Sequence, residues 1–188
     1  MTTTINADTV VGGAVVTADA SGILGLQSAG TTAITLSSGN TTIAQKLTAV
    51  GNSSNAGMKI ADVLETATIS ATAATGTINY DVTTQAVLYY TSNASANWTV
   101  NFRGSSGTSL NTLMATGESL TVAFFVTQGA TAYYNNAVQV DGSSVTPKYQ
   151  GGTAWSSGNA SSIDAYTYTI IKTGNAAFTV FAAQTKFA

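Results

Sequence analysis

Apolar and polar residues alternate along most of the second half of the chain, as they do in β-strands with one buried face. The alternation is clear over residues 78–82, 98–102, 120–126 and 166–170, where aromatic or aliphatic side chains occupy every second position. About eight short strands at 8–12-residue spacing are typical of a β-sandwich or jelly roll. We therefore expect an all-β fold, with a β-sandwich or jelly-roll-like domain over residues 76–188.

Turn and cap signals place three further features in this domain. Asp141-Gly142 and Gly174-Asn175 each separate two apolar runs, a pattern that predicts β-hairpins. One short helix is expected over Ser109–Ala115, with Ser109 as its N-cap and Gly117 following its end.

The first half of the chain has a different character. All of the aromatic residues (2 Trp, 8 Tyr and 6 Phe) lie at or after Tyr80, which places a composition boundary near residue 75. Short apolar runs predict short strands, such as those at 10–11, 15–16, 23–24 and 34–36, with glycine and serine turns between them. Residues 43–50 have helical spacing, and 51–55 resemble a linker.

A segment without aromatic side chains builds little core of its own. We therefore expect residues 1–75 to form an extended, short-stranded assembly or attachment region, in which several chains pair their strands. The alternative is that this segment packs along its own second half. Association of several copies, together with the usual symmetry of homo-oligomers, predicts a symmetric homo-oligomer.

Composition excludes many functions. Thr, Ala, Ser and Gly together make up more than half of the chain, and charged residues are 7% against roughly 25% in ordinary domains. The six Lys and Arg are scattered, so no basic footprint for nucleic acid is present. The chain has no Cys and no His, which excludes disulfides, thiolate chemistry and the commonest general base.

A surface of hydroxyls and amides suits the outside of a cell or particle, yet no export signal is recognisable. The first 26 residues contain no Lys or Arg and no long apolar run, unlike a signal peptide. No segment has the ~18 apolar residues of a membrane helix, so no membrane insertion is expected. A virus particle assembled in the cytoplasm and released by lysis would explain both observations. Leaderless export and a lost leader are the alternatives.

Several phrases of the sequence resemble a C-terminal module of virion structural proteins from tailed phages, particularly phages of cyanobacteria and other aquatic bacteria. The likeness covers roughly residues 65–188. The phrases that carry it are Ser70–Val82, Val87–Ser92, Asn97–Ser106, Val126–Tyr134, Asp141–Lys148, Ala160–Asp164 and Ala183–Ala188.

Two phrases near the N-terminus, Ala18–Gln27 and Ala29–Thr35, resemble the opening of phage fibre-like proteins. Together the resemblances imply a particle component, either a fibre-like or a decoration protein, and, because trimers are common among such proteins, a homotrimer. They imply no catalytic residue.

The candidate chemistry is sparse. Eight carboxylates are present, but none forms the recognisable pair that a glycosidase needs. No calcium-loop pattern occurs, and Gly104–Gly107 lacks the lysine of a phosphate loop. We expect no catalytic residue, no metal site and no cofactor, although a trimer axis could bring three copies of one Asp together.

Trp155, Tyr133 and Tyr134 are the candidate binding residues. They are flanked by Gly, Ala, Asn and Ser, which predicts loops, and exposed aromatic rings stack on sugars or dock partners. We expect the loop that carries Trp155 to contact a neighbouring subunit or a host glycan. The competing interpretation is that Trp155 folds back to fill the end of its own sandwich.

Taken together, these features predict a non-enzymatic structural protein on the outside of a tailed bacteriophage particle, as a small tail fibre or appendage or as a head decoration protein. Its expected partners are its own copies, capsid or tail proteins and a host surface glycan. The alternative is a secreted adhesin or glycan-binding β-sandwich module. A glycan-degrading enzyme is disfavoured because no carboxylate pair is recognisable.

Overall fold

The computed structural model describes residues 24–28, 31–36, 41–42 and 62–188, and it divides the chain into two units, 1–62 and 63–188. The N-terminal unit contains a small antiparallel sheet in the order β1-β2-β3, which comprises β1 (Leu24–Ser28), β2 (Thr31–Leu36) and β3 (Thr41–Thr42). Strands β1 and β2 coincide with two of the predicted apolar runs. The other predictions for this region, at 10–11, 15–16, 43–50 and 51–55, lie outside the described residues.

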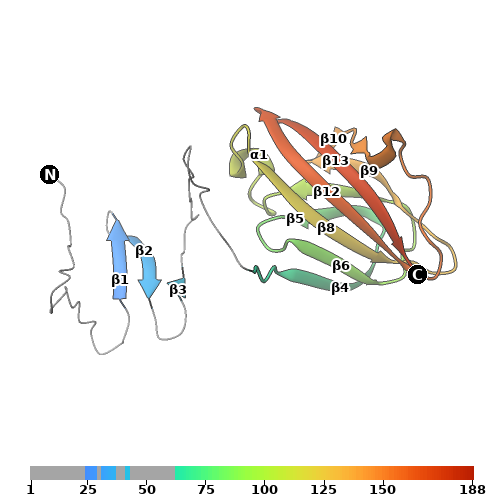
Figure 1. Cartoon of the computed structure of the whole chain (residues 1–188), viewed down its shortest axis with the longest axis horizontal. Helices are drawn as coiled ribbons and strands as arrows, with labels where there is room; N and C mark the ends of the chain where they lie inside the picture. The colour runs from blue at the N-terminus through green and yellow to red at the C-terminus, as the bar shows by residue number, and fades with distance from the viewer. Residues whose placement is uncertain (1–23, 29–30, 37–40, 43–61) are drawn as a thin grey trace. The chain divides into compact units, whose positions relative to one another are not determined.

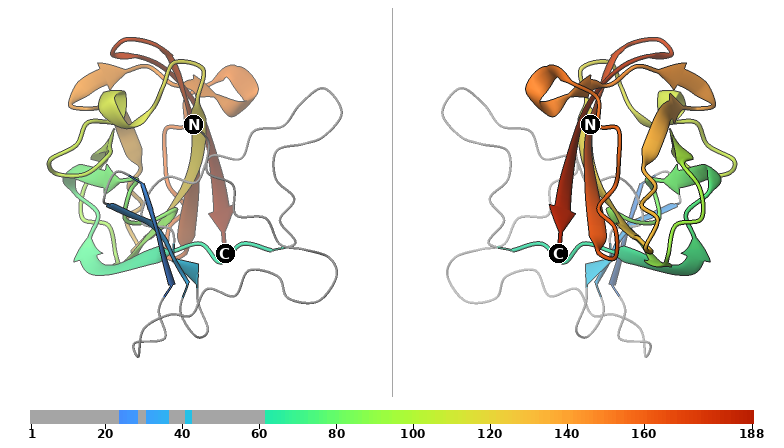
Figure 2. Two further views of the ribbon diagram at one scale, coloured as in Figure 1. Left: turned by 90° about the vertical axis from the view of Figure 1, so that its left-hand side faces the viewer. Right: turned by 90° about the vertical axis from the view of Figure 1, so that its right-hand side faces the viewer.

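The C-terminal unit is a two-layered β-sandwich (Figure 1; Figure 2 views the layers side-on), as the alternation predicts. One layer is a four-stranded sheet in the order β10-β9-β7-β5, made of β5 (Gly76–Asp81), β7 (Trp98–Arg103), β9 (Asn135–Val140) and β10 (Ser143–Val145). The other is a six-stranded sheet in the order β11-β13-β12-β8-β6-β4, made of β4 (Ala67–Ala73), β6 (Val87–Ser92), β8 (Ser119–Thr127), β11 (Lys148–Tyr149), β12 (Ile163–Gly174) and β13 (Ala177–Phe187).

The chain changes sheet after every strand from β4 to β8. As a result β4, β6 and β8 are parallel neighbours in one layer, and β5, β7 and β9 are parallel neighbours in the other. Five of the eight pairings within residues 63–188 are parallel, whereas jelly rolls are built from antiparallel strands. From β4 to β9 the chain therefore winds back and forth between the two sheets. The antiparallel hairpins β9–β10 and β12–β13 complete the sandwich.

The C-terminal unit begins at Val63, before the composition boundary that we placed near residue 75. The difference arises from β4, which pairs with β6 at the edge of the six-stranded sheet but contains no aromatic residue. Its side chains are mostly exposed. Backbone pairing with β6 therefore holds β4 in the sandwich, and amino-acid composition gives no sign of such pairing.

The core lies between the two layers and is aromatic. Trp98, Val100 and Phe102 are buried, as their alternation predicts. Phe102 contacts both Tyr80 and Tyr168, with ring centroids 5.5 and 4.9 Å apart. Contacts of this kind contribute about 0.5–1.5 kcal/mol each beyond the area that they bury.

One end of the sandwich, which we call the helix end, carries the predicted short helix α1 (Leu110–Leu113). The Ser109 hydroxyl accepts a hydrogen bond from the Thr112 N–H (3.0 Å) and caps the helix as expected. Asp141, in the β9–β10 hairpin turn, accepts hydrogen bonds from the N–H groups of Leu110 and Asn111 at 2.7 and 2.9 Å. Asp141 and the Gly142 that follows it both have positive φ angles (50° and 79°), as a tight hairpin turn requires.

Candidate functional site

The opposite end of the sandwich, which we call the loop end, is formed by two long loops. Residues 128–134 connect β8 to β9, and residues 150–162, which begin with a 3₁₀ turn (Gln150–Gly152), lead into β12. The Gln128 N–H donates to the Ser162 carbonyl, and the Ser161 N–H donates to the Gly129 carbonyl, both at 2.8 Å. These bonds extend the β8–β12 pairing and join the two loops.

A buried polar cluster locks the loops together behind this seam. The Gln128 amide donates to the Tyr133 carbonyl (2.8 Å) and to Asp164 Oδ2 (3.0 Å), while its Oε1 accepts from the Tyr133 N–H (2.9 Å). The Asn159 N–H also donates to Asp164 Oδ2 (3.0 Å). Gln128 is 2% exposed and Asp164 is 0% exposed. Both side chains therefore position backbone from two separate loops.

Gly158 is required by this arrangement. A Cβ atom at this position would lie 2.2 Å from the Tyr133 carbonyl oxygen and 2.6 Å from Asp164 Oδ2. Neither atom has room to move, because both belong to the buried cluster. Glycine is thus the residue that allows the 150–162 loop to close over the cluster.

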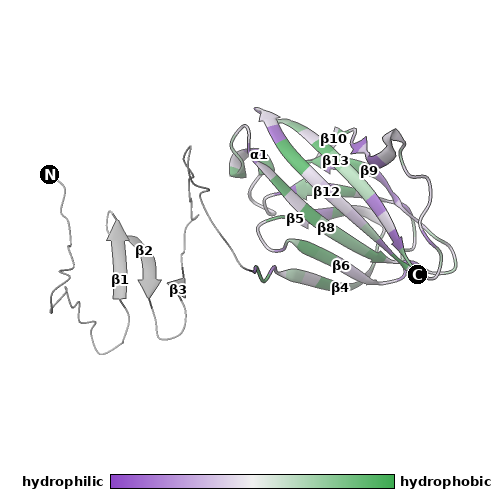
Figure 3. Ribbon diagram, in the orientation of Figure 1, coloured by the Kyte–Doolittle hydropathy of each residue, from purple (hydrophilic) through white to green (hydrophobic). Residues whose placement is uncertain are grey.

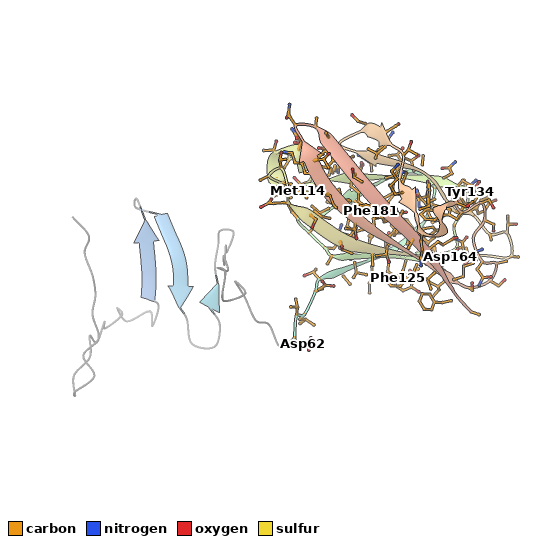
Figure 4. The ribbon with its side chains drawn as sticks, turned by 45° about the horizontal axis from the view of Figure 1, so that its top comes forward. Asp62, Met114, Phe125, Tyr134, Asp164 and Phe181 are labelled. Atoms are coloured by element: carbon orange, nitrogen blue, oxygen red, sulfur yellow. The ribbon has the colours of Figure 1, made fainter. Side chains whose placement is uncertain are left out.

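The environment of Asp164 disfavours its charge. Burial raises the pKa of the Asp164 carboxyl, and hydrogen bonds from Asn159 and Gln128 together with the charge of Lys186 offset this only in part. The second carboxyl oxygen, Oδ1, is buried without a hydrogen-bond partner. Asp164 is fully buried, and Figure 4 labels it at the same end of the sandwich as Tyr134.

The raised pKa of Asp164 predicts a pH-dependent stability. Because the folded-state pKa exceeds the unfolded value of about 3.9, the folded state binds more protons between the two values, and stability falls as pH rises through the folded pKa. Asp164→Asn removes this titration. Urea denaturation between about pH 4 and pH 7 should show the wild type losing stability relative to the variant as pH rises. A constant difference over this range would contradict the burial of an ionisable group here.

Trp155 lies against the core of its own sandwich. Its ring contacts Tyr149, Tyr166 and Tyr168, with centroids 4.8, 5.2 and 6.4 Å apart, and its Nε1–H donates to the Asn135 carbonyl. This is the geometry of the competing interpretation, in which the ring fills the sandwich end, because the flanking 150–162 loop is folded back. Only the exposed part of the half-buried Trp155 ring is left to contact a partner.

Tyr133 and Tyr134 lie at the same end as Trp155. The Tyr133 side chain packs against the core, and its backbone is held by Gln128. The backbone of Tyr134 is also held in place. Its N–H donates to the Asn97 side chain (3.0 Å), and its carbonyl accepts from the Trp98 N–H. The structure thus gathers all three predicted residues, each half-buried, into the wall of the loop end.

A cleft of about 550 Å³ lies beside the loop end, on the outer side of the six-stranded sheet. The sequence does not predict it, because its residues come from four separate segments and have no common spacing. None of its side chains is acidic or basic. It is lined by Asn93, Thr127, Gln128, Gly129, Ala130, Ser161, Ser162, Ile163, Phe187 and Ala188.

The outer face of the six-stranded sheet carries apolar and hydroxyl side chains. Ile69, Tyr89 and Phe125 pair across β4, β6 and β8, and the Tyr89 and Phe125 rings are 6.1 Å apart. Ile69 is 70% exposed. In Figure 3 the hydrophilic colour on this sheet is concentrated toward the ends of β12 and β13. The face is suited to contact with another surface rather than to ion binding.

Neither a metal-ligand cluster nor a membrane-length apolar helix occurs in the described part of the chain. His, Cys, Asp and Glu form no group of three or more there that could hold a metal ion. No helix in the same residues is long and apolar enough to cross a membrane.

Compared with models of protein families, with curated proteins and with solved structures, the chain matches none of them.

Proposed function

We propose that this chain is a non-enzymatic structural protein on the outside of a tailed bacteriophage particle, either a small tail fibre or appendage or a head decoration protein. It assembles as a homotrimer and contacts capsid or tail proteins. It resides in the virion, binds no nucleic acid and inserts into no membrane. The phage assignment derives from the sequence resemblance, and the structural role is supported by how the sandwich uses its charged residues.

The observation that carries the structural role is that most charged side chains of the sandwich serve to hold the fold. Asp164 fixes the loop end and Asp141 caps α1, as described above. The Lys172 ammonium is buried and donates to the carbonyls of Asn111 and Met114, the latter at 2.8 Å. Asp81 pairs with Arg103, and Glu118 accepts from the Ala115 N–H. Groups committed in this way are not poised for acid–base or nucleophilic catalysis.

The outer face of the six-stranded sheet supports an assembly role. Its exposed apolar residues include Ile69 and Phe181, which is 46% exposed (Phe125 and Phe181 are labelled in Figure 4). Exposed apolar patches of this kind mark protein contact sites in soluble proteins. Such a face suits a particle protein that is surrounded by its own copies and by capsid or tail proteins.

Purified particles test the proposal directly. Mass spectrometry of gradient-purified phage whose genome encodes this chain should detect it in constant ratio to the major capsid protein, also after a high-salt wash. Labelling with an antibody against the sandwich, viewed by electron microscopy, should mark the outside of heads or tails. Absence from particles, with the chain present in the lysate, would contradict the proposal.

A second candidate is a secreted adhesin or glycan-binding module. The specific observation that favours it is the cleft at the loop end, which has no charged side chain. Amides, hydroxyls and an aromatic ring line it, and these groups can contact a glycan whether or not the chain is part of a particle. Detection of the chain in culture medium without particles would favour this second candidate.

A further inference from the structure

The cleft at the loop end has the properties of a binding site for a small ligand. Its volume of about 550 Å³ lies within the range of about 300–1,000 Å³ that is usual for ligand sites. It differs from the predicted site, because Trp155, Tyr133 and Tyr134 are not part of its lining. It is therefore a second candidate site at this end of the sandwich.

Strand register builds one wall of the cleft. Ile163 pairs with Thr127 on β8 and with Phe187 on β13, so these three residues lie side by side on the outer face of the sheet. The row spans two strand spacings, roughly 9–10 Å. It presents a hydroxyl-bearing residue, an aliphatic side chain and an aromatic ring in succession. Phe187 is 50% exposed, so its ring remains accessible to a ligand.

Polar groups without protein partners lie around this wall. Within the described residues, the side chains of Asn93 and Ser161 make no hydrogen bond to protein, and Thr127 Oγ1 is buried without a partner. Ser161 is held at a positive φ of 55°, a conformation that is uncommon for a non-glycine residue and recurs at functional sites. The exposed Asn93 amide and Ser161 hydroxyl are thus available to donate and accept hydrogen bonds.

The cleft offers no charged side chain to an ionic ligand. None of its lining side chains is ionisable. Asp164 follows Ile163 directly, but it points to the opposite side of the sheet, where it is buried in the Gln128 cluster. Lys186 is directed toward the Ser157 hydroxyl (3.4 Å). A charged ligand would lose its hydration here without gaining a counter-charge from any lining side chain.

The walls of the cleft are pre-formed. The Gln128 side chain uses both of its polar atoms to hold Tyr133 and Asp164, and the Gln128–Ser162 and Ser161–Gly129 backbone bonds fix the loops on either side. Gly129 lets the Asn93 side chain approach closely, since a Cβ there would lie 3.1 Å from Asn93 Nδ2. Fixed walls reduce the entropy that a ligand must offset when it binds.

We infer that this cleft binds an uncharged sugar residue, with one apolar face of the sugar ring stacked on Phe187 and its hydroxyls hydrogen-bonded to Asn93 and Ser161. Sugars combine apolar C–H faces with a ring of hydroxyls, which matches a site of one aromatic ring and several neutral donors and acceptors. The inference deepens the proposed outward-facing role by naming a host glycan as the ligand and the cleft as its site.

Saturation-transfer NMR on the purified full-length chain tests this inference. The probes are millimolar glucose, galactose, mannose and N-acetylglucosamine, with glucuronic acid and glucosamine as charged comparators. Any purification tag belongs at the N-terminus, because Phe187 and Ala188 line the cleft. At least one neutral sugar should bind, more tightly than the charged comparators. Phe187→Ala should weaken its binding at least about tenfold, equivalent to about 1.4 kcal/mol.

Phe181→Ala is the matched control, since Phe181 is a similarly exposed phenylalanine on the same strand and lies outside the cleft. It should leave the affinity within about twofold. Asn93→Ala, at an exposed side chain, gives a second measurement if Phe187→Ala fails to fold. The inference is overturned if none of the neutral sugars binds, if the charged sugars bind more tightly, or if both phenylalanine variants bind alike. These results concern the purified chain, so they are distinguishable from absence of the chain in particles.

Discussion

Replacing Trp155 with alanine is expected to lower the free energy of unfolding of the sandwich by about 3 kcal/mol, the lower end of the range for deleting a large core aromatic. The lower end applies because the ring is half-buried. Its removal deletes the contacts to Tyr149, Tyr166 and Tyr168 and leaves the Asn135 carbonyl without the Nε1–H donor. Urea denaturation, monitored by circular dichroism, measures the change.

Trp155→Phe separates the two contributions. A phenyl ring preserves most of the packing but cannot donate to Asn135, so a loss of about 1 kcal/mol is expected, the usual net value of one hydrogen bond. If Trp155→Ala instead left stability unchanged while particle attachment or assembly was lost, the ring would serve a partner and not the core. The outcome therefore decides between the two interpretations of this loop.

The inner faces of the sandwich could be predicted because burial follows a period of two whatever the neighbouring strand is. Trp98, Val100 and Phe102 are buried for this reason. The hairpin at Asp141-Gly142 and the cap at Ser109 could also be predicted, since each depends on residues within a few positions of one another. Local patterns thus indicate elements and their buried sides.

The path of the chain between the two sheets could not be predicted in this way. Apolar and polar residues alternate within β5 or β7 in the same way whether the neighbouring strands are parallel or antiparallel. The alternation therefore does not reveal that the chain crosses to the other sheet after each of these two strands. The loop end depends on Gln128 meeting Asp164, 36 residues away. Trp155 was expected in an exposed loop because its neighbours are small and polar. Those neighbours, Gly158 above all, are instead what lets the loop fold onto the core.

The boundary of the sandwich leads to the second prediction with a large effect. A fragment of residues 63–188 should unfold cooperatively, whereas a fragment of residues 76–188 should be destabilised by on the order of 3–5 kcal/mol, at about 1 kcal/mol for each of several lost hydrogen bonds. The shorter fragment lacks β4, whose backbone pairs with β6. It also lacks the carbonyls of Ser70 and Ala71, which accept from the hydroxyls of Thr91 and Ser92.

Loss of β4 has a further consequence, because it uncovers the edge of β6. That strand has the sequence Val-Leu-Tyr-Tyr-Thr-Ser, with no charge and no proline to prevent pairing with another chain. We therefore expect the 76–188 fragment to aggregate with rising concentration, as measured by light scattering, while the 63–188 fragment stays dispersed. Equal stability and equal dispersion of the two fragments would place the boundary near residue 75, shortly before the first aromatic residue, Tyr80. A difference between them would show that β4, a strand without a single aromatic residue, protects the edge of the sheet.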